Sequence, residues 1–333
     1  MGSLLILLFI LLAAVVPTVF YVLLAYWLDR YEKEPLHLLI ITFLWGAVPA
    51  IIVSLIFELI FEVPLRIVVT GVGADLVSAA VIAPMVEESA KAVPLVLIFL
   101  IFRHEFDGLM DGLIYGALVG FGFAMTENIF YYLQAAEEGL GMLSLLITMR
   151  GIVYGLNHAL FTSAAGIGLA YARYTRSRSQ ALLAFFLGLA GAIFLHMAHN
   201  FLVSLGSANF ILLSLVVDWG GALLWLALMW GALRVEKRWI SEELGEEVAS
   251  GLLSPDHATA AASYRARLRE RWATVREHGF GRAHQIGEMH NAAAKLGVLK
   301  RQMRMHEVPD QDIAKLHELR NQIWAMRQEL GEV

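Results

Sequence analysis

Long apolar stretches dominate the first two thirds of the chain. Each of seven stretches is long enough to form a helix that crosses the hydrocarbon core of a membrane, which takes about 20 residues. They cover residues 4–28, 36–61, 76–102, 108–134, 150–172, 180–204 and 209–233. A shorter apolar stretch at 139–149 cannot span and predicts a re-entrant or interfacial segment. The pattern therefore predicts an all-α, polytopic membrane bundle of about seven transmembrane helices.

The pattern changes after residue 233. Residues 257–277 and 282–305 are rich in Ala, Arg and Glu and predict two helices. Beyond residue 309, apolar side chains recur at spacings of three and four, which mark one face of a further helix. These are Ile313, Leu316, Leu319, Ile323, Met326 and Leu330. We therefore divide the chain into a transmembrane core, residues 1–233, and a small helical soluble domain, residues 234–333.

The soluble domain has two interpretations. The simpler one is a helical appendage that packs on itself. The alternative is a domain that binds a cytoplasmic partner or self-associates.

Composition supports the membrane assignment. Hydrophobic residues make up 58% of the chain and charged residues 17%, against about 45–50% and 25% in typical globular proteins. A single soluble core of this length cannot hide so much apolar surface. The absence of cysteine excludes disulfide bonds, thiolate catalysis and Cys-ligated metals. A net charge of −5 without a dominant basic run gives no indication of a nucleic-acid partner.

Basic residues in short connections indicate how membrane helices are oriented. Nine of them fall on one side of the predicted bundle, and Arg66 alone falls on the other. The nine are Arg30, Lys33, Arg103, Arg173, Arg176, Arg178, Arg234, Lys237 and Arg238. This asymmetry predicts a multi-pass protein with the N-terminus outside and residues 234–333 in the cytoplasm. We expect the membrane to be a bacterial-type cell membrane.

Four predicted spans carry ionisable residues at membrane depth. A charge there costs at least about 2.5–3.5 kcal/mol and usually marks a functional site. In the third span, Lys91 follows Glu87 by four residues and Glu88 by three. Both carboxylates can therefore reach the ammonium group from one helix. The three residues leave one uncompensated negative charge, an arrangement suited to acid–base chemistry.

The fourth and fifth spans add a third acid and a histidine. The fourth contains Glu127 and Asn128. The fifth begins at Arg150, and Asn157 lies seven residues, or nearly two helical turns, further on. We therefore expect Arg150 and Asn157 to share one face, with His158 beside it.

The sixth span carries His196 and Asn200, four residues apart and thus on one face. At about 1.5 Å of rise per residue, Glu87, Glu127, His158 and His196 fall in one layer in the outer half of the membrane. This agreement in depth predicts a single shared site. His199 lies off the His196 face and is interpreted as a packing residue.

Buried acids and histidines in one layer allow three kinds of chemistry. A glutamate can activate water while a second acid or a histidine stabilises the developing charge. Alternatively, Glu and His side chains can hold a zinc ion while the remaining glutamate acts as the base. Both arrangements hydrolyse amides. The third possibility is a transporter that moves protons or cations.

Four short motifs occur in order on four successive predicted spans. They are Glu87-Glu88-x-x-Lys91, then Phe123-x-x-x-Glu127-Asn128, then Arg150 with His158 eight residues on, then His196-x-x-x-Asn200. Together these motifs resemble the PrsW family of intramembrane proteases, which is similar to the CAAX-endopeptidase and bacteriocin-processing superfamily. The resemblance covers residues 20–230 and leaves out the last hundred residues.

The resemblance implies a membrane peptidase that cleaves membrane-anchored protein substrates, such as anti-sigma-factor-like regulators. It leaves open whether the catalysis is of the glutamic type or the metallo type. We expect the glutamic type, without a cofactor. If zinc is used, the expected ligands are Glu127, His158 and His196.

Within the glutamic interpretation, each motif has an expected role. Glu87 is the expected base, and Glu88 is the second candidate. Glu127 and His158 would polarise or orient the water, and His196 and Asn200 would stabilise the oxyanion. Three residues, Lys91, Asn128 and Arg150, would support the acids. A water-filled cavity open towards the outer face is expected, because hydrolysis consumes water.

Overall fold

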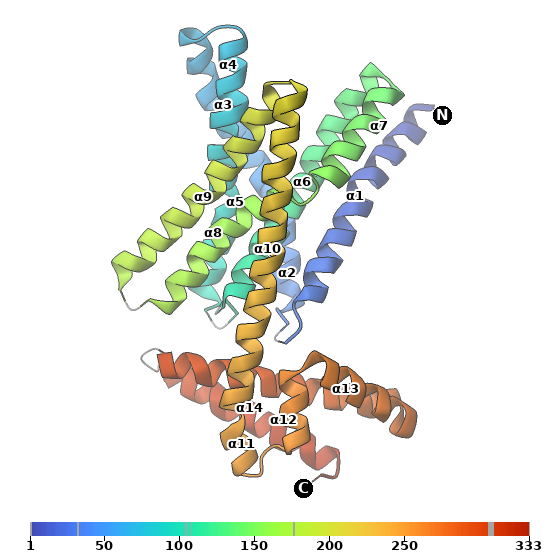
Figure 1. Cartoon of the computed structure of the whole chain (residues 1–333), viewed down its shortest axis with the longest axis vertical. Coiled ribbons are helices and arrows are strands. Elements are labelled where there is room, and N and C mark those ends of the chain that lie inside the picture. Colours follow the sequence, from blue (N-terminus) through green and yellow to red (C-terminus); the bar gives the residue numbers. More distant parts are fainter. Residues whose placement is uncertain are drawn as a thin grey trace. The chain divides into compact units, whose positions relative to one another are not determined.

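The computed structural model describes residues 2–31, 33–103, 105–106, 108–175, 177–305 and 310–332. Arg176, one of the basic residues used for the orientation, lies outside these ranges. The described residues form helices and no strand (Figure 1), which confirms the predicted fold class. The protein is therefore a multi-pass helical membrane protein.

The chain divides into two compact units. The first consists of residues 1–28 and 34–229, and the second of residues 29–33 and 230–333. The division near residue 233 that was expected from the sequence falls within helix α10 (Ala208–Glu243), which begins in the first unit and ends in the second. The short connection at 29–33 belongs to the second unit, whereas the sequence placed it in the core.

Within the described residues, six helical stretches are long and apolar enough to cross a membrane. Their elements, in order, are α1 (Gly2–Leu28); α2 (Leu36–Trp45), η1 (Gly46–Ala50) and α3 (Ile51–Val68); α6 (Leu109–Glu138); α7 (Leu140–Thr148), η3 (Met149–Val153) and α8 (Asn157–Tyr174); α9 (Arg178–Ser204); and α10 with α11 (Gly245–Ala249).

The third predicted span is not among these six. It is formed by α4 (Val72–Val77), the π-helical turn η2 (Ser78–Ile82) and α5 (Ala83–Ile101). The segment is helical as expected, but Glu87, Glu88 and Lys91 give α5 too many charges to count as an apolar span. All three side chains are buried, so α5 is shielded by its neighbours.

The fifth predicted span is interrupted. α7 and η3 incorporate the stretch expected as a separate short segment, and the helix stops after Val153. Tyr154 leaves helical geometry with φ −105° and ψ 12°, and α8 starts at Asn157. The expectation that Arg150 and Asn157 share a face of one helix is therefore wrong, because the π-turn and the break disrupt the register.

Close backbone contacts place α6 against its neighbours. α6 packs against α1, α2, η1, α7 and α8. A Cβ atom on Gly166 of α8 would overlap the backbone oxygen of Gly112, and one on Gly120 would overlap the backbone oxygen of His158. Glycine at these positions lets helix backbones approach closely in membranes. The contact at Gly120 brings the start of α8 against α6, two turns before Glu127.

The second unit contains α12 (Pro255–Ala262), α13 (Tyr264–Met305) and α14 (Asp310–Glu329). α13 is not one straight rod, because Gly279 has φ 84° and ψ 176°. Arg267 Nη1 donates to Asn291 Oδ1 at 2.9 Å although the residues are 24 positions apart, a separation of about 36 Å along a straight helix. The arms 264–278 and 280–305 therefore fold back on each other, close to the break that the sequence predicted.

A buried carboxylate joins α11 to the helices around it. Glu247 Oε1 accepts hydrogen bonds from Arg320 Nη2 at 2.6 Å and from Lys300 Nζ at 2.9 Å. The predicted apolar face of α14 contributes buried Leu319, Ile323 and Leu330 to the same unit.

Candidate active site

The first unit encloses a cavity of about 550 Å³, which is within the usual range for ligand sites. Seven of the nine residues singled out from the sequence line it. These are Glu87, Glu127, Asn128, Arg150, His158, His196 and Asn200. The other two, Glu88 and Lys91, do not line the cavity and are buried in the protein.

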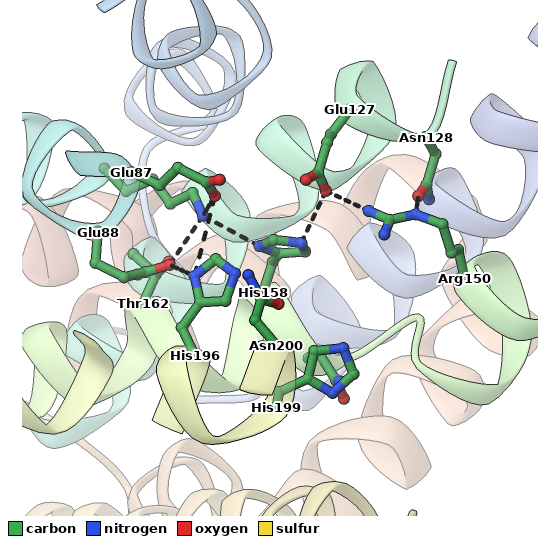
Figure 2. A network of polar contacts seen from close by, with 12 residues as sticks. Glu87, Glu88, Glu127, Asn128, Arg150, His158, Thr162, His196, His199 and Asn200 are labelled. Carbon is green, nitrogen blue, oxygen red and sulfur yellow. Dashed lines mark hydrogen bonds and ion pairs between the residues drawn. The ribbon is translucent and has the colours of Figure 1, made fainter. Parts of the chain in front are cut away.

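Lys91 is the centre of a polar cluster that includes Glu87, Glu88 and His158, and Figure 2 shows these three partners. Its Nζ donates to Glu87 Oε2 at 3.0 Å and to Glu88 Oε1 at 2.8 Å, as the spacing on α5 predicted. The same Nζ lies 3.1 Å from His158 Nδ1 and 3.7 Å from the centre of the Phe123 ring. The ammonium is fully buried, and the two carboxylates compensate its charge.

Glu88 is held by partners on three helices. Besides the bond from Lys91, its Oε1 accepts from His196 Nδ1 at 3.0 Å, and its Oε2 accepts from Thr162 Oγ1 at 2.9 Å. Glu87 makes its short contact to Lys91 and lies further, 3.9 Å, from His196 Nδ1. Both Glu88 oxygens are therefore committed to structure, whereas Glu87 faces the cavity.

Glu127 organises the other side of the cavity. Its Oε2 accepts from Arg150 Nη2 and lies 3.0 Å from His158 Nε2. Arg150 Nε also donates to Asn128 Oδ1 at 2.8 Å, and its guanidinium lies 3.8 Å from the centre of the Tyr131 ring. Arg150 and His158 thus reach one carboxylate from opposite sides of the helix break.

His158 connects the two groups of residues. Since Lys91 donates to Nδ1, this nitrogen accepts, and the ring proton is assigned to Nε2, which donates to Glu127. The hydrogen-bond network therefore sets both the tautomer and the orientation of the ring. The convergence of α5, α6, α8 and α9 agrees with the common depth predicted from the sequence.

On α9, His196 and Asn200 lie one turn apart and both line the cavity. Asn200 Nδ2 donates to the backbone oxygen of Ala79 at 2.9 Å. His199, interpreted as a packing residue, also lines the cavity, and its Nδ1 lies 2.7 Å from Asp218 Oδ2 on α10.

Two residues near the site were missed by the sequence analysis. Thr162 lies four positions after His158 on α8 and therefore on the same face, a spacing that could have revealed it. Glu58 on α3 also lines the cavity. By sequence it lies near the end of its span, and no spacing within α3 connects it to the other acids.

The donor chemistry of the cluster suits a metal ion. Ligand atoms of Glu87, Glu88, His158 and His196 all lie within 4.8 Å of one another, and zinc takes such oxygen and nitrogen ligands. This is not the expected set of Glu127, His158 and His196. Glu127 contacts Nε2 of His158, whereas Lys91, which binds Glu87 and Glu88, contacts Nδ1 on the other edge of the ring. Membrane depth alone could not show which edge of the ring faces which acid.

Lys91 already contacts most of these donors. Its Nζ lies within 3.1 Å of Glu87, Glu88 and His158. An ion held by all four residues would share its donors with the ammonium group. The residue types therefore fit a metal, while the lysine supplies positive charge to the same atoms.

Acids and histidines gathered around one cavity of a helical membrane bundle can hydrolyse peptide bonds within the membrane. Residues 34–232 match the family described as "PrsW family intramembrane metalloprotease". The chain belongs to the PrsW family, as the four motifs indicated, and is a membrane protease.

Three relatives carry the name "Protease PrsW". The chain is 31% identical to the one from Geobacillus kaustophilus (strain HTA426) over 231 residues, which cover 68% of this chain and 90% of that protein. It is 27% identical to the one from Clostridioides difficile (strain 630) over 176 residues, which cover 53% of this chain and 71% of that protein. It is 30% identical to the one from Bacillus subtilis (strain 168) over 154 residues, which cover 46% of this chain and 63% of that protein. No solved structure matches the chain.

We expect Glu127→Gln to lower the rate of proteolysis by roughly 10- to 100-fold, the usual effect of losing a partner that orients a functional histidine. The amide carries no charge for Arg150 and holds His158 less firmly, so kcat should fall more than KM rises. Cleavage of a membrane-tethered reporter by the purified protein measures both constants.

The matched control is Glu137→Gln, which changes an exposed acid at the end of the same helix. It should cleave like the wild type. Unchanged kcat in Glu127→Gln would show that the Glu127 carboxylate does not position His158 for the reaction.

Proposed function

We propose that this membrane protease is an endopeptidase that hydrolyses membrane-anchored proteins, with Glu87 as the general base that activates water. One observation carries the proposal. Among the residues of the Glu87, Glu88 and Lys91 cluster, only Glu87 lines the cavity. Glu88 has donors at both oxygens, and Lys91 binds both acids from behind the cavity wall.

The charges of the cluster support this role. Lys91 neutralises one of the two adjacent carboxylates, and Arg150 neutralises Glu127. One negative charge remains, and in the proposal Glu87 carries it. Its oxygen takes a proton from water as the water oxygen bonds to the scissile carbonyl carbon. The protonated acid then delivers that proton to the leaving amine as the C–N bond breaks.

The oxyanion formed in this step needs hydrogen-bond donors on the opposite side of the carbonyl. His196 and Asn200 are placed for this on one face of α9. An asparagine amide has two N–H groups, and the bond to Ala79 uses one of them. The second N–H of Asn200 would stabilise the oxyanion. His196 would add a second donor in its doubly protonated form, because Glu88 accepts the single N–H of the neutral ring. His158, whose two nitrogens contact Lys91 and Glu127, would hold these two residues in place beside the water.

The second candidate is the zinc-dependent form of the same hydrolysis. It is favoured by the convergence of Glu87, Glu88, His158 and His196 and by the description of the matched family. Zinc held by these residues would supply Lewis acidity and ease the deprotonation of water. We favour the metal-free form because the Lys91 ammonium contacts three of the same four donors.

The proposed substrates are proteins held in the membrane by an anchor, such as anti-sigma-factor-like regulators, a class suggested by the family resemblance. The cavity reaches Ser204 and Ile211, which flank the turn between α9 and α10. Since that turn carries no basic residue, we place it outside the cell and the cleavage in the outer half of the membrane.

Glu87→Gln should lower cleavage of a co-expressed, membrane-tethered reporter by roughly 10²- to 10⁴-fold, the usual contribution of a general base. The substitution keeps the size of the side chain but removes the proton acceptor. Membrane proteins that accumulate in cells carrying this variant are the candidate substrates. Glu62→Gln is the control, since this acid pairs with Arg66 and does not line the cavity. Full activity of Glu87→Gln would reject the proposal.

Metal content distinguishes the two catalytic types. For the glutamic type, a chelator leaves the activity of the purified enzyme unchanged, and wild type and His158→Ala contain equal amounts of zinc. One equivalent of zinc that is lost in His158→Ala, together with activity that a chelator removes and zinc restores, would instead establish the metal-dependent form.

The orientation can be tested with single cysteines, because the chain has none of its own. Ser207→Cys places a thiol in the α9–α10 turn, and Ser179→Cys places one at the opposite end of α9. Both positions are exposed. A membrane-impermeant maleimide added to intact cells should label position 207 and spare position 179. The reverse pattern would show that the N-terminus faces the cytoplasm.

A further inference from the structure

A second group of histidines and carboxylates lies in the second unit, beyond the residues that match the family. His257 Nδ1 lies 3.2 Å from His290 Nε2 and 2.8 Å from Glu270 Oε1. His290 Nε2 lies 3.4 Å from Glu270 Oε2. Two imidazole nitrogens and one carboxylate thus point at the same place.

The fold brings these residues together from distant positions. Glu270 and His290 lie on opposite arms of α13, and a straight helix would separate them by about 30 Å. The reversal at Gly279 places them side by side. His257 lies in the first turn of α12, where its backbone N–H donates to the capping hydroxyl of Ser254 at 3.1 Å.

We propose that His257, Glu270 and His290 bind a zinc ion that joins α12 to both arms of α13. Ligands about 2.0–2.1 Å from a tetrahedral zinc lie about 3.3 Å from one another. The distance between the two histidine nitrogens is 3.2 Å, and those from the histidines to Glu270 are 2.8 Å to Oε1 and 3.4 Å to Oε2; all three are close to this value. The donors are therefore spaced for one ion.

A fourth residue supports the ligand role of His257. Glu332 Oε2 lies 3.0 Å from His257 Nε2, so this nitrogen donates to the carboxylate and Nδ1 keeps its lone pair for the metal. Metal-bound histidines usually have such a carboxylate or carbonyl partner on the other nitrogen. The carboxylates of Glu270 and Glu332 supply negative charge on both sides of the His257 ring.

Hydrogen bonding alone accounts poorly for the cluster. His257 Nδ1 and His290 Nε2 face each other at 3.2 Å, and each also lies near a Glu270 oxygen. His290 is fully buried, and its Nδ1 has no hydrogen-bond partner among the described residues. A zinc ion would use the lone pairs of the two facing nitrogens, His257 Nδ1 and His290 Nε2. The Glu270 side chain is 25% exposed, which leaves a path for the ion.

Zinc binding by the intact, detergent-solubilised protein tests the site. After treatment with a chelator, the protein is titrated with Zn²⁺ in competition with a chromogenic chelator. His290→Ala and Glu270→Gln should each bind one equivalent less than the wild type. Glu332→Gln should keep the equivalent but bind it roughly 10- to 100-fold more weakly, as expected for a partner that orients a ligand.

The matched control is His284→Ala, which removes an exposed histidine from the same arm of α13 and should bind as much zinc as the wild type. Co²⁺ gives a second readout, since the wild type should show the visible absorption of a tetrahedral site and Glu270→Gln should lose it. Glu270→Gln keeps the shape of the side chain, so an unchanged elution profile separates loss of the ligand from loss of the fold.

Two outcomes would overturn the proposal. One is equal zinc content in the wild type, His290→Ala and Glu270→Gln. The other is the same loss in His284→Ala, which would mean that the ion binds surface histidines adventitiously. Each variant is compared with the wild type, so zinc bound elsewhere in the protein cancels. The result is therefore independent of the catalytic type of the protease.

Discussion

The ammonium group of Lys91 is the charge on which the arrangement of the membrane unit depends. A buried charge is strongly unfavourable unless it is paired and hydrogen-bonded. Lys91 meets this condition by contacting Glu87, Glu88 and His158 at 2.8–3.1 Å. Lipid cannot provide such partners, so the charged face of α5 has to point into the bundle, while Met85, Val93 and Leu97 on its other face are exposed. This explains why the helix with the most charges among the predicted spans also buries all of them.

His158 links the Lys91 cluster, which contains Glu87 and Glu88, to Glu127 on the other side of the cavity. One edge of its ring contacts Lys91, and the other contacts Glu127, which Arg150 neutralises. The close backbone approach at Gly120 places α8 near enough to α6 for this contact. The result separates the acids by environment. Glu88 and Glu127 are each engaged by several donors, whereas Glu87 lines the cavity and has Lys91 as its close donor.

The sequence-based predictions were accurate for contacts within one helix and less accurate for contacts between helices. The pairs within α5 were confirmed, because spacings of three and four positions bring side chains together on any helix. The shared depth of Glu87, Glu127, His158 and His196 agrees with their convergence. The shared face of Arg150 and Asn157 was wrong, because it assumed a continuous helix through residues 154–156. The expected zinc ligands differed because the choice depends on which edge of His158 faces which acid.

The sequence by itself determined the membrane location, the helical class, the family and seven of the polar residues that line the cavity. These properties follow from local hydropathy, helical spacing and short motifs, which can be identified directly from the order of the residues. Only the tertiary structure decided that Glu87 rather than Glu88 lines the cavity, and that Lys91 contacts a histidine 67 positions away. It alone brought His257, Glu270 and His290 together across the reversal at Gly279. Such contacts depend on how helices pack and where the chain turns, and no periodicity within one segment encodes them.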